Sequence, residues 1–438
     1  MIALATLLLF AAAAPASPAV PSLRVADDDL SLEALLERYR SEQQRLFDTY
    51  RVEVESVATA LEAVKGRDRT RELEQLRGRL LDLGPQATPL LVPYIDPGLK
   101  ASDGKKRRSA QVTQVLLQLS TRAVTPRVID VLEKGSLEGQ RNAIRVLGAS
   151  DDPERAGQVL REKFTGATSG RRGELITAIA TLGTPANFDF LGEVLGNKDP
   201  DVVRSAIESL TAARCSAAGP KILDLVKATL AAASHVDAIV AYYRACPDVV
   251  DEEHCAALVR FATSLTGNSR EAEKVLFTIG DFDDVWSSKV KKDLKELADS
   301  PSTRIREAAM ICLVRAGDRG MRRKLLEAYD ERIEENDRLA SAWQNRAEVK
   351  FRIGDYKGAI KDYTEAMRKS EAYLRTEPEI YIGLARSNAR LGKPKDAAGW
   401  LDRGGLSIAQ LHVLARDPDF DEVRADPKLA KVFRLGEE

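Results

Sequence analysis

Few of the side chains from which catalytic sites are built occur in this 438-residue sequence. It has three histidines and four cysteines, and aromatic residues make up 5% of it. The three histidines, His235, His254 and His412, lie too far apart in the chain to form a local metal site. The run from Glu252 to Cys255 lacks a second Cys or His at ligand spacing, so we expect His254 to be a surface residue on a helix.

Motifs of known catalytic chemistry are also missing. The sequence contains no nucleophile elbow, phosphate-binding glycine loop, dinucleotide fingerprint or His-Glu-x-x-His motif. It therefore predicts a protein that is not an enzyme, with no catalytic, cofactor-binding or metal-binding residues to name.

An excess of charge of one sign is absent as well. Lys and Arg (66) almost cancel Asp and Glu (67), which leaves a net charge of −1. Nucleic-acid binding depends on neutralising many phosphates, so no nucleic-acid partner is expected. The one dense basic run, Lys105 to Arg108, is interpreted as a solvated loop that enters a helix. No segment after the N-terminus approaches 18 consecutive apolar residues, so the mature chain should have no membrane span.

The N-terminus is apolar and short. Residues Ile2 to Ala14 are almost wholly apolar, and two small-residue cleavage candidates follow, Ala14-Pro15-Ala16 and Ser17-Pro18-Ala19. This resembles a secretory signal peptide over residues 1–19, although no Lys or Arg precedes Arg24. The resemblance implies an exported protein, and the sequence does not distinguish a periplasmic from a fully secreted one.

Export bears on the four cysteines. In an oxidising compartment a disulfide is expected, either Cys246–Cys255 or Cys215–Cys246, and the sequence does not choose between these pairings. Cys312 stands apart inside an apolar helical pattern, which predicts a buried free thiol.

Periodicity predicts helices throughout. From Leu32 to Val64 apolar residues recur at spacings of three and four, which predicts a long helix within residues 28–66. Gln43 and Glu53 interrupt its apolar stripe, so docking on the following helices is expected rather than a coiled coil, although oligomerisation through this helix stays open.

Residues 70–330 repeat weakly. Three segments share the pattern Arg-x-Ala-apolar-x-x-Leu; they begin at Arg141, Arg204 and Arg306, and Cys312 takes the Leu position in the third. Asp199 and Pro200 suit the cap and first turn of a helix. Val203, Ala206, Ile207 and Leu210 then form one apolar stripe. Four glycines are predicted to end helices in the left-handed conformation: Gly148, Gly183, Gly280 and Gly317.

This pattern resembles the HEAT-repeat family, in particular its short bacterial form. The resemblance covers residues 70–330 and implies about seven stacked antiparallel helix pairs. Within residues 335–438, Ala342–Met367 and Tyr381–Leu401 resemble two tetratricopeptide repeats, and Asp417–Phe433 resembles the segment that closes some bacterial arrays of them. Trp343, Gly354, Tyr356 and Tyr363 stand at consensus positions, whereas Arg346 occupies a position more often taken by Leu.

These observations predict an all-α solenoid. A solenoid exposes a long surface that commonly binds proteins, so the expected function is a non-catalytic exported scaffold or adaptor for protein partners. One alternative is a structural or oligomeric spacer of the cell envelope. Another is phycobilin-lyase-like activity on a partner protein, since short HEAT-like repeats also occur in those enzymes. The partner, its pathway, the binding surface and the oligomeric state stay open.

Overall fold

The computed structural model describes residues 32–65, 69–282, 285–369 and 378–435. All regular secondary structure in these ranges is helical, so the chain is an all-α protein, as its composition and periodicity predict. It divides into two compact units between Leu119 and Ser120. The signal peptide expected over residues 1–19 lies outside the described residues. No helix in the ranges above is both long enough and apolar enough to cross a membrane.

The first unit is built around one long helix, α2, which spans Leu32–Ala63 where the sequence predicts it. Four further helical segments pack with it: α3 (Arg69–Asp82), α4 (Thr88–Leu91), α5 (Asp103–Leu116) and the 3-10 turn η2 (Pro85–Ala87). The side chains that α2 buries against them all lie towards its C-terminal end: Val54, Val57, Ala58 and Leu61.

The basic run is not a solvated loop; it belongs to the first turns of α5. The Arg107 guanidinium donates from Nε to the carbonyl of Leu61 (3.1 Å) and from Nη2 to that of Glu62 (2.9 Å), and Arg108 pairs with the Glu62 carboxylate. The last carbonyls of a helix lack intrahelical donors and carry partial negative charge, which a cation satisfies. Arg107 therefore caps α2, and Arg108 adds an ion pair between α5 and α2.

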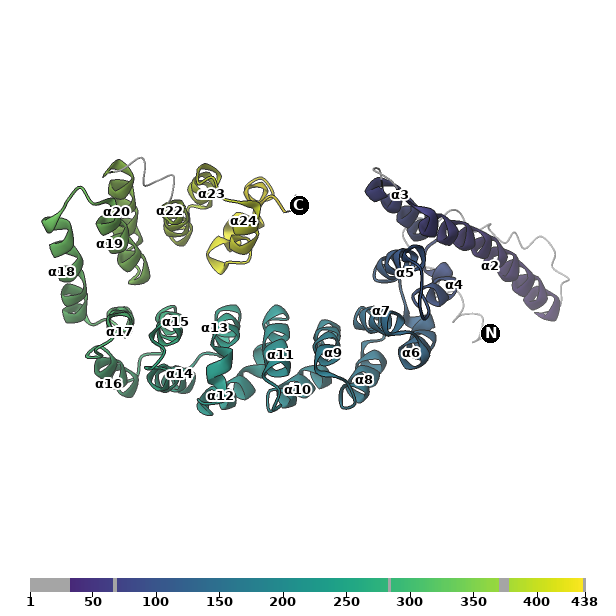
Figure 1. Ribbon diagram of the computed structural model, residues 1–438, viewed down its shortest axis with the longest axis horizontal. Helices are drawn as coiled ribbons and strands as arrows, with labels where there is room; N and C mark the ends of the chain where they lie inside the picture. Colours follow the sequence, from purple (N-terminus) through teal and green to yellow (C-terminus); the bar gives the residue numbers. More distant parts are fainter. Residues whose placement is uncertain (1–31, 66–68, 283–284, 370–377, 436–438) are drawn as a thin grey trace. The chain divides into compact units, whose positions relative to one another are not determined.

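The second unit begins with six helix pairs in two rows (Figure 1). In one row each helix packs on the next: α7 (Leu137–Gly148), α9 (Ser169–Leu182), α11 (Pro200–Ala212), α13 (Val236–Ala245), α15 (Ser269–Gly280) and α17 (Thr303–Arg315). The other row contains α6 (Thr125–Lys134), α8 (Pro153–Phe164), α10 (Pro185–Val194), α12 (Gly219–Lys227), α14 (Glu252–Ser264) and α16 (Ser288–Leu297). This part of the chain is an α-solenoid consistent with HEAT-like repeats. It has fewer pairs than the seven expected over residues 70–330 because residues 69–119 fold with α2 instead.

Helix α11 shows how the repeat sequence produces the repeat structure. The Asp199 side chain caps the helix by accepting from the backbone N–H of Asp201 (3.0 Å), and Pro200 occupies the first position. Its predicted apolar stripe is buried, with Ala206, Ile207 and Leu210 fully inaccessible. The cap fixes where α11 begins, and the buried stripe fixes which side of α11 packs on its two neighbours in the row.

Two of the four glycines predicted to end helices do so in the left-handed conformation, Gly183 (φ 65°) and Gly317 (φ 91°). The prediction is wrong for Gly148 and Gly280, which are the last residues inside α7 and α15. A Cβ on Gly148 would lie 2.8 Å from the Cβ and 2.9 Å from the Cα of Ala178. Gly148 is required because α7 and α9 approach each other closely there.

Side-chain hydrogen bonds join successive turns at three places in the solenoid. In each case a serine hydroxyl donates to an aspartate 30 to 32 residues later. The three bonds join Ser120 to Asp151, Ser169 to Asp199, and Ser216 to Asp248. Ser120 and Ser216 precede the first helix of a pair, whereas Ser169 begins α9, the second helix of its pair, so the bonds share a spacing of about one repeat but not one equivalent position.

The rest of the second unit continues the packing in series. After α17 come α18 (Arg319–Glu335), α19 (Ala340–Arg352), α20 (Tyr356–Lys369), α22 (Glu379–Arg390), α23 (Pro394–Arg403), α24 (Ile408–Leu414) and α25 (Asp421–Ala425), with the 3-10 turns η8 (Pro418–Phe420) and η9 (Ala430–Phe433). Tyr363 is fully buried in the core of α19, α20 and α22, and Phe420 and Phe433 close the last core. Gly354 and Gly392 take left-handed conformations at the turns after α19 and α22.

Arg346, the residue that departs from the repeat consensus, is the centre of an ionic network. Its guanidinium binds the Asp362 carboxylate through two hydrogen bonds (2.7 and 2.8 Å) and Asp330 through a third (2.7 Å). Lys350 also reaches Asp362 (2.8 Å), whose side chain is 4% exposed. The departure is therefore compensated by an aspartate on the neighbouring helix α20.

Candidate protein-binding groove

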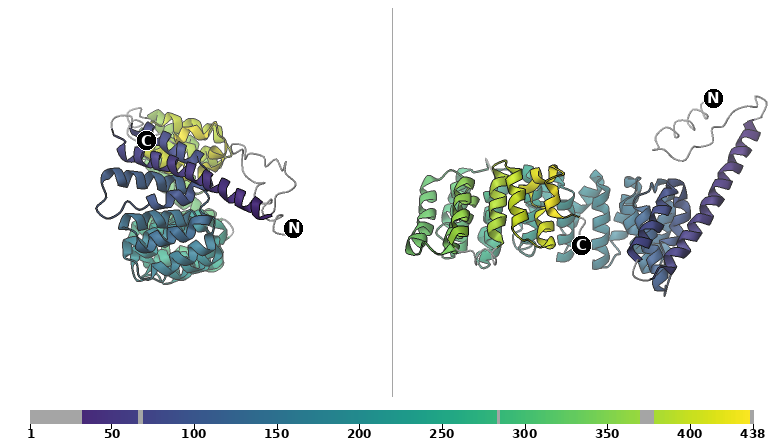
Figure 2. Two further views of the ribbon diagram at one scale, coloured as in Figure 1. Left: turned by 90° about the vertical axis from the view of Figure 1, so that its right-hand side faces the viewer. Right: turned by 90° about the horizontal axis from the view of Figure 1, so that it is seen from above.

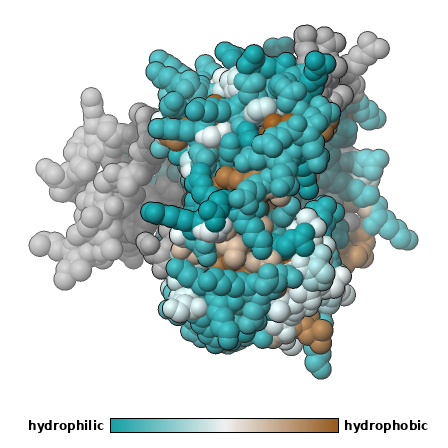
Figure 3. All heavy atoms as spheres, turned by 90° about the vertical axis from the view of Figure 1, so that its left-hand side faces the viewer, coloured by the Kyte–Doolittle hydropathy of each residue, from teal (hydrophilic) through white to brown (hydrophobic). Residues whose placement is uncertain are grey.

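Among the described residues, the face of the protein that Figure 3 shows has no broad apolar patch. That face is mostly hydrophilic, and its hydrophobic residues form small separate patches. A hollow is therefore a better guide to a binding site than hydrophobicity alone.

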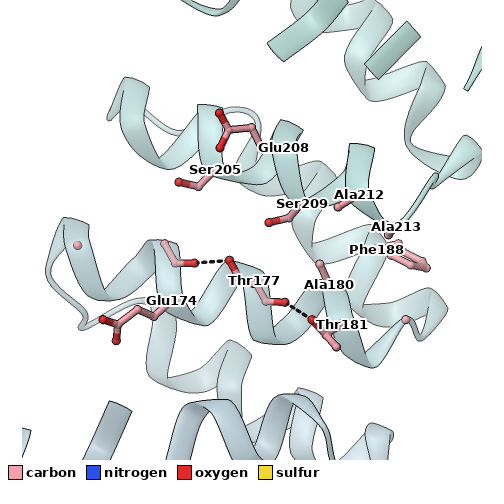
Figure 4. A pocket seen from close by; sticks show the side chains of 13 residues that line it. Glu174, Thr177, Ala180, Thr181, Phe188, Ser205, Glu208, Ser209, Ala212 and Ala213 are labelled. Carbon is pink, nitrogen blue, oxygen red and sulfur yellow. Dashed lines mark hydrogen bonds between the residues drawn. The ribbon is translucent and has the colours of Figure 1, made fainter. Parts of the chain in front are cut away.

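A groove of about 830 Å³ lies between α9 and α11 (Figure 4). Most of the side chains that line it are small or hydroxylated, with one aromatic ring and two carboxylates at its margins. Its lining residues on α9 include Gly170, Gly173, Glu174, Thr177 and Thr181, and those on α11 include Ser205, Glu208, Ser209 and Ala212.

The groove lies between two helices that no ion pair bridges in the described ranges, whereas three other neighbouring pairs in the row are bridged by long side chains. Arg141 of α7 binds Glu174 of α9 (3.0 Å), Lys274 of α15 binds Asp237 of α13 (2.6 Å), and Arg304 of α17 binds Glu273 of α15 (3.0 Å). The small side chains on both helices leave the hollow open, although Ser205 Oγ lies only 3.5 Å from where a Cβ of Gly173 would be.

Three of the four hydroxyl groups that line the groove are turned towards their own helices. Thr177 Oγ1 donates to the carbonyl of Gly173 (3.1 Å), Thr181 Oγ1 to that of Thr177 (2.8 Å), and Ser205 Oγ to that of Asp201 (2.9 Å). Figure 4 shows the two threonine bonds along α9. These hydroxyls need no partner from a ligand, so the walls present methyl and methylene groups to whatever enters.

Negative charge remains at the margins. Glu208 is exposed on α11 and makes no ion pair within the described residues. Glu174 uses one carboxylate oxygen for Arg141, while its other oxygen is buried without a hydrogen-bond partner. The groove thus combines a mainly apolar floor with two carboxylates that favour a positively charged side chain.

The cysteines lie elsewhere. All four are buried free thiols, so neither Cys246–Cys255 nor Cys215–Cys246 is bonded in the structure. Cys215 and Cys246 stand at equivalent places in successive repeats, directly before the 3-10 turns η5 (Ser216–Ala218) and η7 (Pro247–Val249), and the Tyr242 hydroxyl donates to the Cys215 carbonyl (2.9 Å). Burial raises the pKa of both thiols.

Cys255 and Cys312 lie on α14 and α17. Burial raises the pKa of Cys255 to about 12, and it also raises the pKa of Cys312. The Cys312 thiol donates to the carbonyl of Leu276 (3.0 Å), which confirms the buried free thiol predicted there. A thiol that serves as a hydrogen-bond donor in a core has a structural role.

The expectation that His254 is a surface residue is wrong. Its side chain is buried and its Nδ1 lies 2.8 Å from Oδ1 of Asp251, which also accepts from the backbone N–H of His254. These two bonds lower the pKa of Asp251. The histidine therefore completes the cap of α14. In the ranges that the structure describes, no three Cys, His, Asp or Glu side chains gather as a metal ion would require.

Comparisons with known proteins give fold-level likeness alone. No family model matches the chain, and no curated protein matches it. Among solved structures it is similar to the karyopherin Kap121p bound to the SUMO protease Ulp1p, at 12% identity over 87% of this chain and 45% of that one, with a TM-score of 0.47. Kap121p by itself matches at 13% identity over 92% and 46%, with a TM-score of 0.43. The chain spans less than half the length of these karyopherins, so their partners are not transferred to it.

The groove could not be found from the sequence. Gly170 and Gly173 are visible there one turn apart, but a pair of glycines has many uses. Ser205 and Ser209 face these glycines from the next repeat only because the two helices pack together in the folded protein.

Proposed function

We propose that this chain is an exported, non-catalytic scaffold that binds a helix of a partner protein in the groove between α9 and α11. The observation that carries the proposal is the groove itself, a hollow of about 830 Å³ in which Thr177, Thr181 and Ser205 donate their hydroxyl hydrogens to their own helices. Export rests on the resemblance of residues 1–19 to a signal peptide.

A helix suits the groove better than an extended strand. An extended peptide needs hydrogen-bond partners for its backbone, but the backbone N–H and C=O groups of α9 and α11 are already bonded within their own helices. A helix satisfies its backbone internally and can lay an apolar row into a groove with small walls. Gly173 and Ser205 let such a helix approach closely.

The charge of the groove specifies a further feature of the partner. Glu208 at the margin favours a Lys or Arg beside the apolar row of the bound helix. An exposed pair of this kind contributes modest affinity but discriminates against acidic partners.

We propose that residues 335–438 extend the scaffold as tetratricopeptide repeats. The support is the burial of their consensus residues, for example Ala347, Ala359 and Tyr363 in one core and Leu401 in the next. Arg322 of α18 bonds to Asp355 at the turn before α20 (2.9 Å), so this segment is tied to the helix that follows the HEAT-like rows.

The test is selection from a library of helix-forming peptides that carry random residues along one face. Binders to the protein from Val20 onward are expected to share an apolar row flanked by Lys or Arg. Thr177→Trp should abolish their binding by filling the groove, and Glu208→Lys should weaken it about tenfold.

Two matched controls make the result specific. Thr263 on α14 is also exposed and also bonds to the carbonyl four residues earlier, so Thr263→Trp should leave binding intact. Glu296→Lys makes the same charge change on α16. Binders that tolerate Thr177→Trp, or a selection that yields none, would refute the groove as the binding site.

A further inference from the structure

The long helix α2 has a covered half and an uncovered half. From Val54 onward it packs on α3, α4 and α5, and it buries Val54, Val57, Ala58 and Leu61 there. Between residues 37 and 53 no described side chain is buried, and Leu46 is 48% exposed. Figures 1 and 2 show this half extending past the helices that pack on the other.

The apolar stripe of α2 continues beyond the part that α3, α4 and α5 cover. Leu46 and Tyr50 stand at spacings of four before Val54, and Val57 and Leu61 continue the same row. Apart from the polar residues Gln43 and Glu53, one row therefore continues along the helix, fully buried from Val54 to Leu61 and not buried at Leu46 and Tyr50. Isolated helical segments of this length are marginal in water, so the uncovered half gains stability from a partner.

The charges that flank the uncovered stripe most closely are arranged by sign, with Arg38 and Arg45 farther out on the acidic side. At 3.6 residues per turn, Arg40 and Arg51 lie on one side of the stripe, and Glu42 and Glu53 lie on the other. In two parallel helices packed stripe to stripe, the basic side of each faces the acidic side of the other; in an antiparallel pair, like sides meet. In register, each glutamate is then only about 3 Å along the axis from an arginine of the opposite helix.

We infer that α2 pairs in parallel with α2 of a second copy of this chain, so that the protein is a dimer joined through residues 37–53. The pattern of basic and acidic flanks is self-complementary. A helix that binds an unrelated partner does not need such a pattern. The local bonds of these residues do not prevent the pairing, because Arg38–Glu42 and Arg51–Asp48 are exposed pairs and Glu53 uses one oxygen for Arg79 of α3.

The test is sedimentation equilibrium of the protein from Val20 onward, which retains every described residue. At about 10 µM it should sediment with twice the monomer mass. Leu46→Glu places a charge in the stripe and should raise the dissociation constant at least about 30-fold. Val52→Glu is the matched control: Val52 is 66% exposed but lies two residues after Tyr50, on the opposite side of α2.

Orientation is tested by charge reversal. Glu42→Arg and Arg40→Glu should each weaken the dimer, because like charges then face each other on both sides. An equimolar mixture of the two variants should restore it, since both contacts of a parallel heterodimer are again attractive. Circular dichroism confirms that each variant is folded.

Three results would overturn the inference. They are a monomeric wild-type protein, a dimer that resists Leu46→Glu, and a dimer that Val52→Glu disrupts equally. Failure of the mixture to recover would reject the parallel arrangement. None of these results affects peptide binding in the groove, so the two proposals fail independently.

Discussion

The ionic network around Arg346 yields a quantitative prediction. Arg346→Leu introduces the residue that the repeat consensus prefers, but it leaves the Asp362 carboxylate, 4% exposed, with Lys350 as its remaining cation. Loss of two charge-assisted bonds to a buried carboxylate should lower the free energy of local opening by about 2–3 kcal/mol. The consensus residue is therefore expected to destabilise this protein.

The double variant Arg346→Leu/Asp362→Leu removes both charges at once. Replacing a buried ion pair by apolar side chains of similar size is often neutral, so this variant should lie within about 1 kcal/mol of the wild type. Asp330 is 48% exposed, and the Lys350 side chain, 17% exposed, can turn its ammonium group to solvent on its long aliphatic stem. The coupling energy between the two sites should therefore exceed about 1 kcal/mol.

Hydrogen exchange followed by mass spectrometry suits this measurement. Repeat arrays need not unfold in one step, whereas the exchange of α19 and α20 peptides reports their own opening free energy. Arg323→Leu is the control, because Arg323 is 81% exposed and its pair with Glu327 should contribute less than about 0.5 kcal/mol. Unchanged exchange in Arg346→Leu, or a double variant as unstable as the sum of the singles, would refute the reasoning.

Three further predictions concern histidine, cysteine and glycine. Burial, together with the nearby positive charge of Arg204, lowers the pKa of His235 below its usual 6.5. Because the unfolded chain then binds more protons than the folded one, stability falls as the pH drops below 6.5. The melting temperature should therefore decrease between about pH 7.5 and about pH 5.5, and it should decrease less in His235→Gln. A thiol reagent should label no cysteine in the native protein and four after unfolding without reductant, whereas two labelled thiols would show that a disulfide forms. Gly148→Ala should cost about 1–3 kcal/mol, because its Cβ would overlap Ala178, whereas Gly399→Ala in α23, with nothing within 4 Å, should be neutral or stabilising by up to about 1 kcal/mol, as thermal melts can show.

Much of the architecture could be read from local signals. The caps, proline positions and apolar stripes that the repeats share act within one or two helical turns, so the helix at Pro200–Ala212 was predictable with its cap. The alternation of short helices with turns was enough to indicate a solenoid. Domain boundaries were harder, because the division at Leu119 depends on which neighbours residues 69–119 pack against.

Where local reasoning failed, a contact distant in sequence decided the outcome. Gly148 resembles a helix-ending glycine, yet it is needed for the approach of a helix 30 residues away. Arg107 belongs to a basic run that would suit solvent, yet it binds the carbonyl end of a helix more than 40 residues earlier. Neither role has a local signature, since each is defined by the surface of the other helix.

Composition and periodicity alone establish a helical chain, its repeats and its lack of catalytic motifs, because hydrophobic spacing and capping act along the chain. The groove between α9 and α11 and the open half of α2 depend on the tertiary structure. Within the described residues, the groove is present where no bridging side chain joins the two helices, and the open part of α2 is present where no other helix covers it. Such an absence becomes visible only when the neighbouring elements are in place.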